Sequence, residues 1–128
     1  MTPYAGITSA AAADAAAEVL DRAADIFTVR GGGQGRWVSG GKVCVNGAIA
    51  MAAGLIDEDH QCIGWLPRCG HGDITPRIPS ARYFTDWCVS TYGFHSWIVN
   101  DYKPKRDVDL TDGLRLAAKD LRNGRWQP

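Results

Sequence analysis

Two histidines and two cysteines lie close together near the middle of the chain, in the mirrored order His60, Cys62, Cys69 and His71. Thiolates and imidazoles are ligands of structural zinc, and four of them complete a tetrahedral site. Bound zinc would also order the loop that carries them. The spacing differs from that of common zinc fingers, because a single residue separates the members of each pair. The alternatives are a core position for Cys62 with solvated histidines, or a Cys62–Cys69 disulfide, which a reducing compartment disfavours.

A second set of residues could support nucleophilic catalysis. Cys44 stands at the start of an apolar run that predicts a helix, and the N-terminus of a helix favours the thiolate form of a cysteine. Cysteine hydrolases combine such a thiolate with a distant histidine and an asparagine or aspartate that orients it. His95, followed by Asn100 or Asp101, occurs in the order that this chemistry requires. The structural alternative is that Cys44 packs in the core and that Asn100 and Asp101 form a turn.

A third set combines basic and aromatic residues near the end of the chain. Arg115, Lys119 and Arg122 would lie on one face of a helix, with Arg125 and Trp126 just beyond it. Such a surface could contact phosphates and bases, or it could be an ordinary solvated helix face. Tryptophan and arginine are also enriched in the hot spots of protein interfaces. We therefore expect a protein partner, with the following candidate contact residues: Trp37, Trp126, Arg122 and Arg125.

The composition sets limits on these interpretations. The 128 residues include 14 basic and 14 acidic side chains, so the formal net charge is zero, which argues against nucleic acid or a membrane surface as the partner. The hydrophobic fraction of 45% is that of a globular protein, and the length suits a single domain over residues 1–128. We see no span of about 18 apolar residues and no export signal. We therefore expect a cytoplasmic protein with reduced cysteines and no cofactor other than the zinc considered above.

The periodicity of apolar residues predicts a mainly α fold with about four helices. Residues 43–53 form the central short helix against which the others pack, and residues 57–79 form a long loop or insertion that carries the histidines and cysteines. Small extended or hairpin pieces are expected at 37–43 and 94–99. The expected helices cover residues 10–27, 43–53, 80–92 and 110–123, and Ser80 is expected to be the N-cap of the third helix.

A pattern of residues resembles a family of small uncharacterised proteins from actinobacteria and their bacteriophages, classed as a domain of unknown function. The matching residues are Arg36-Trp37, then Gly41, Cys44 and Gly47-Ala48, then Ile98 to Asp101, and finally Val108, Leu114, Ala117 and Ala118. The family often has tryptophan directly before the Asn-Asp pair, where this chain has Val99, and the loop at 57–79 is not part of the pattern. The resemblance implies a small helical cytoplasmic protein, in the host cytoplasm if it is phage-encoded, and it brings no known activity.

Together these features predict a non-enzymatic protein that binds a protein partner, and a phage or actinobacterial accessory role. The alternatives are a zinc-binding protein that uses the loop at 60–71, or a hydrolase that uses Cys44.

Overall fold

The computed structural model describes residues 6–33, 38–56, 78–103 and 108–127, and within these ranges the protein is mainly helical. The helices are α1 (Ala10–Arg30), α2 (Val45–Ala52), α3 (Pro79–Tyr92), α4 (Ser96–Tyr102) and α5 (Leu110–Arg122). Two short strands, β1 (Val38–Ser39) and β2 (Lys42–Val43), pair as an antiparallel hairpin. The predicted helical class and the hairpin at 37–43 are confirmed. None of the described helices is long and apolar enough to cross a membrane.

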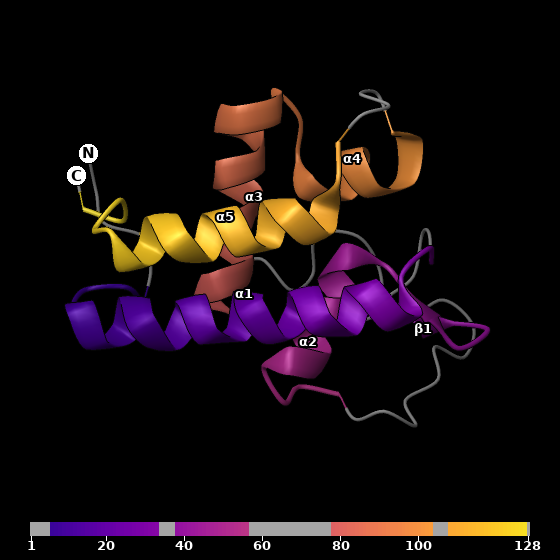
Figure 1. Cartoon of the computed structure of the whole chain (residues 1–128), viewed down its shortest axis with the longest axis horizontal. Coiled ribbons are helices and arrows are strands. Elements are labelled where there is room, and N and C mark those ends of the chain that lie inside the picture. Colours follow the sequence, from indigo (N-terminus) through magenta and orange to yellow (C-terminus); the bar gives the residue numbers. More distant parts are fainter. Residues whose placement is uncertain (1–5, 34–37, 57–77, 104–107, 128) are drawn as a thin grey trace.

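Helices α1 and α5 lie side by side and antiparallel, and α3 crosses behind them (Figure 1). Ser9 begins α1, because its Oγ accepts a hydrogen bond from the backbone N–H of Ala12 at 3.1 Å. Asp109 begins α5 in the same way, through the backbone N–H of Thr111 at 2.9 Å. The facing surfaces consist of small and aliphatic residues, which allow the two helices to approach closely. The buried residues of the two helices, which also pack against other elements, are Ala13, Ala16, Ala17, Leu20, Ala23 and Ala24 in α1, and Leu110, Gly113, Leu114, Ala117, Ala118 and Leu121 in α5.

Helix α2 packs against α1 on the side away from α5 (Figure 1). Every residue of α2 is buried except Met51, which is partly exposed. The sequence therefore predicted correctly that this helix is a core element. Helices α1 and α2 both contact α3 and β2, while α1 alone of the two packs against α5 and α2 alone packs against α4.

Two local predictions were wrong. Residues 94–99 were expected to be extended, but Ser96–Tyr102 forms α4, so the described chain has five helices. In this helix Ser96, Val99 and Asn100 are buried, at the three- and four-residue spacing of one helical face. Ser80 was expected to cap α3, but the helix begins at Pro79, whose fixed φ angle suits the first helical position.

Candidate functional site

The start of α2 contains a buried hydrogen-bond network centred on Asn100. The Oδ1 of Asn100 accepts from the backbone N–H of Val45 at 3.0 Å, and its Nδ2 donates to the backbone carbonyl of Gly33 at 3.0 Å. The same Nδ2 lies 2.7 Å from Oδ1 of Asp101. One side chain of α4 thus joins the beginning of α2 to the segment that follows α1. The sequence predicted a turn role for Asn100, whereas the structure uses it to connect distant segments.

Cys44 is the N-cap of α2, and its Sγ accepts a hydrogen bond from the backbone N–H of Gly47 at 3.3 Å. Its carbonyl accepts from Ala48 at 2.9 Å, so the side chain and backbone of Cys44 both bind amides of the first turn. Cys44 is only 5% exposed. A substrate carbonyl would therefore have to reach a thiol that packs in the core.

His95 immediately precedes α4, with its ring centroid 6.3 Å from that of Trp97. Its Nδ1 is buried and has no hydrogen-bond partner among the described residues. Burial lowers the pKa of His95, and the nearby charge of Asp86 opposes this effect. Of the residues proposed for catalysis, Cys44 and Asn100 lie together at the start of α2. The amide group of Asn100 is already hydrogen-bonded to backbone atoms and to Asp101. The catalytic role of Cys44, His95 and Asp101 stays a prediction.

The four predicted zinc ligands, His60, Cys62, Cys69 and His71, lie outside the described residues, as do Trp37 and most of the predicted loop 57–79. In the described part of the chain, no group of three or more histidine, cysteine, aspartate or glutamate residues is arranged to hold a metal ion. Zinc binding by the loop at 60–71 therefore stays a prediction.

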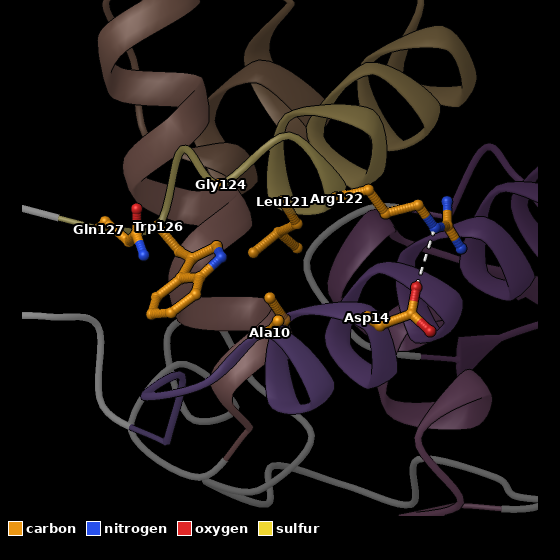
Figure 2. Close-up of a pocket in the computed structure, with 8 residues that line it drawn as sticks. Ala10, Asp14, Leu121, Arg122, Gly124, Trp126 and Gln127 are labelled. Atoms are coloured by element: carbon orange, nitrogen blue, oxygen red, sulfur yellow. Dashed lines mark hydrogen bonds and ion pairs between the residues drawn. The ribbon is translucent and has the colours of Figure 1, made fainter.

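Two of the predicted partner-binding residues, Trp126 and Arg122, line one pocket of about 410 Å³ between the start of α1 and the end of α5 (Figure 2). We call it the α1–α5 pocket; its lining is Ala10, Ala13, Asp14, Leu121, Arg122, Gly124, Trp126 and Gln127. Trp126 is only 9% exposed, so its indole is packed against the protein and forms one wall of the pocket. Arg125 is not among the lining residues, and its Nε lies 3.7 Å from Asp120. The role of these residues in binding a partner stays a prediction.

The basic face of α5 is paired with acidic residues of α1. Nη2 of Arg115 lies 2.7 Å from Asp25, and Nη1 of Arg122 lies 2.6 Å from Asp21. These hydrogen bonds are the first cause of the raised pKa of each arginine. Two of the three cations that could have contacted phosphates are therefore already neutralised within the protein.

Val29 has the highest exposed fraction of the large hydrophobic residues in the described part of the chain, and it lines a groove of about 570 Å³ between α1 and α2. We call it the α1–α2 groove; its lining is Arg22, Asp25, Ile26, Val29, Arg30, Met51, Ala52 and Ile56. The sequence prediction missed it, because the first helix was expected to end at Phe27 and Val29 then falls in a turn. The helix continues to Arg30, which places Val29 one turn after Ile26 on the same face.

Arg30 fixes one side of the α1–α2 groove. Its Nε donates to the carbonyl of Gly41 in the hairpin at 3.1 Å, and its Nη1 lies 3.4 Å from the sulfur of Met51. The guanidinium thereby links the end of α1 to both the hairpin and α2. The walls of the groove are thus held in place by contacts that do not involve a ligand.

Comparison with known proteins identifies no relative: no family model, curated protein or solved structure matches the chain. The function is therefore inferred from the surfaces of the chain itself.

Proposed function

We propose that this chain is a small, non-enzymatic, cytoplasmic protein that binds a partner protein through the α1–α2 groove. The observation that supports this most directly is Val29, which is 83% exposed although it is aliphatic and lies beside other aliphatic residues. Isolated exposed apolar residues are common, but an apolar groove with polar residues at its edge is typical of a binding surface. The resemblance of the sequence to a family of actinobacterial and phage proteins is the basis for proposing an accessory role in an actinobacterial cell.

The partner that fits this groove is an amphipathic helix. The lining residues of α1 run from Arg22 to Arg30, which corresponds to about 12 Å along the helix axis, or about two turns. A bound helix presents apolar anchors at positions i, i+3 or i+4 and i+7, and these cover a similar length. Met51 lies on the opposite wall, and its flexible side chain adapts to anchors of different shape.

The charged residues at the edge of the groove would set the orientation of the bound helix. Asp25 is already paired with Arg115 of α5, and Arg22 lies 3.7 Å from Glu18 in an exposed ion pair. Exposed pairs of this kind contribute little to stability and can exchange partners on binding. An acidic residue flanking the apolar anchors of the partner could therefore replace Glu18 at Arg22.

A hydrolase that uses Cys44 has less support. The thiol caps α2, is 5% exposed, and sits beside an asparagine whose amide binds backbone groups. The four residues of the zinc-binding alternative, His60, Cys62, Cys69 and His71, lie outside the described residues. Metal analysis of the purified protein tests that alternative separately.

The proposal is tested by placing a photo-crosslinking amino acid at Val29 and, as a matched control, at Leu116. Leu116 is an aliphatic residue on α5, is 52% exposed, and lies outside the groove. Irradiation in a host-cell lysate should link a protein to position 29 and not to position 116. The linked peptide should carry apolar residues at helical spacing.

Two substitutions complete the test. V29E should abolish recovery of the partner found at position 29, because it places a charge among the aliphatic anchors, whereas L116E should leave recovery unchanged. Equal crosslinking at both positions, or a partner that V29E still binds, would contradict the proposal.

A further inference from the structure

The α1–α5 pocket combines an apolar wall with a carboxylate at one end. Figure 2 shows Trp126 at one end, Asp14 and Arg122 at the other, and Ala10 and Leu121 between them. Tyr83 stabilises the chain next to Trp126, since its hydroxyl donates to the carbonyl of Arg125 at 3.4 Å. The pocket therefore has a defined apolar stretch that leads to a charged end.

Two carboxylates and one guanidinium meet at the charged end: Asp14 and Arg122 line the pocket, and Asp21 lies just outside it. Arg122 is shared by two carboxylates: its Nη1 lies 2.6 Å from Asp21 and its Nε 3.3 Å from Asp14. The shorter bond is to Asp21, and the hydrogen bond to Asp21 is the first cause of the raised pKa of Arg122. One guanidinium cannot neutralise two carboxylates, and the side chain of Asp14 remains 73% exposed. Asp14 is therefore the group that can accept a new cation.

We propose that the α1–α5 pocket binds a single basic side chain, lysine or arginine, from a peptide or protein. The alkyl stem of such a side chain packs on the exposed Ala10 and on the edge of Trp126, above the buried Leu121, and its cationic head binds the carboxylate of Asp14. Lysine and arginine combine an apolar stem with a charged tip in this way. This site lies apart from the α1–α2 groove and does not depend on the function proposed for it.

Other ligand classes fit the pocket less well. A carboxylate that binds Arg122 would have to displace Asp14 and would still face Asp21 across the guanidinium. A purely apolar side chain would remove water from Asp14 without replacing its lost hydrogen bonds, which is unfavourable. A basic side chain satisfies both the apolar stretch and the excess carboxylate.

The test is an NMR titration of the full chain with three blocked tripeptides, acetyl-Gly-X-Gly-amide, in which X is lysine, norleucine or glutamate. Norleucine has the same alkyl stem as lysine without the charge. The resonances of Ala10, Ala13 and the Trp126 indole N–H should shift, and lysine should bind about threefold more tightly than norleucine, as expected for one exposed ion pair. The glutamate peptide should bind most weakly.

The variant D14N retains the size of the side chain and removes its charge, so it should bind the lysine peptide only as tightly as the norleucine peptide. The control is D25N, which removes an acid of the same helix that is paired with Arg115 and lies outside the pocket. It should leave lysine binding unchanged. Equal binding of lysine and norleucine, tighter binding of glutamate, an unchanged D14N variant, or no shift at these residues up to the solubility limit of the lysine peptide would each overturn the proposal.

Discussion

The surroundings of the two ends of α2 differ: polar side chains are buried at its beginning, and apolar side chains are exposed at its end. At the beginning, the polar groups of Cys44 and Asn100 bind backbone atoms and are almost fully buried. At the end, Met51 and Ile56 line an open groove together with the exposed Val29 of α1. The Cys44 thiol and the Asn100 amide have hydrogen-bond partners within the protein and so leave little for a ligand to bind. An open aliphatic groove, by contrast, leaves apolar surface in water.

This difference separates residues that maintain the fold from residues that are free to bind. Removing one partner from a buried hydrogen-bond network leaves the other group unsatisfied, which is costly. Changing an exposed side chain at the edge of a groove has little effect on the free energy of unfolding. Substitutions at the beginning of α2 should therefore lower stability and have little direct effect on binding. Substitutions in the groove at its end should weaken binding and have little effect on stability.

The largest effect should come from N100A. Removal of the amide leaves the N–H of Val45 and the carbonyl of Gly33 without their buried partner, at a cost of about 3 kcal/mol in the free energy of unfolding. Urea denaturation measures this loss. The control is N123A, an exposed position after α5, which should change stability by less than about 1 kcal/mol. A loss below about 1 kcal/mol for N100A would show that Asn100 does not hold the two segments together.

A smaller effect is expected for C44A, which removes the cap of α2 and should lower the free energy of unfolding by about 1 to 2 kcal/mol. C44S retains an acceptor for the Gly47 N–H and should therefore lose less stability than C44A. If C44S were the less stable of the two, the apolar packing of the sulfur rather than its hydrogen bond would be the important contribution.

A smaller effect still should come from the protonation of His95. Its pKa is lowered from 6.5 in the folded protein, so the unfolded chain binds the proton at higher pH than the folded chain. The contribution of His95 to stability is therefore complete above pH about 6.5 and is lost as the pH falls from that value through the lower pKa of the folded protein. Urea denaturation of the parent protein and H95Q at pH 7.5 and pH 5.5 measures this. The loss between the two pH values should be smaller in H95Q, and equal losses would contradict the assignment.

The long periodic helices could be predicted from the sequence, because the repeats in α1 and α5 extend over several turns and Ser9 and Asp109 supply local caps. Helix α4 could not, since its seven residues are too few to distinguish a helical from an alternating pattern. The role of Asn100 was missed for another reason. Its partners Val45 and Gly33 are 55 and 67 residues away in sequence, and only the folded chain brings them together.

The candidate binding surfaces show the same limit. The cationic face of α5 was predicted correctly as a helical face, but its acidic partners lie on α1, 90 residues away for Arg115 and 101 for the Arg122–Asp21 pair. The α1–α2 groove depended on the last turn of α1, and helix ends are the least certain part of a prediction from sequence. Local sequence patterns thus predicted the apolar and charged faces of the long helices. The contacts between distant segments determined which of these faces are covered within the protein and which are available to a partner.

The smallest effect on stability should come from V29E, although it should have the largest effect on partner binding. Val29 is 83% exposed, so a charge there should change the free energy of unfolding by less than about 0.5 kcal/mol. The comparison is I49V, which removes one methylene group from a fully buried residue of α2 and should cost about 1 kcal/mol. If V29E lowered stability more than I49V, Val29 would belong to the packed core, and the end of α2 would be closed like its beginning.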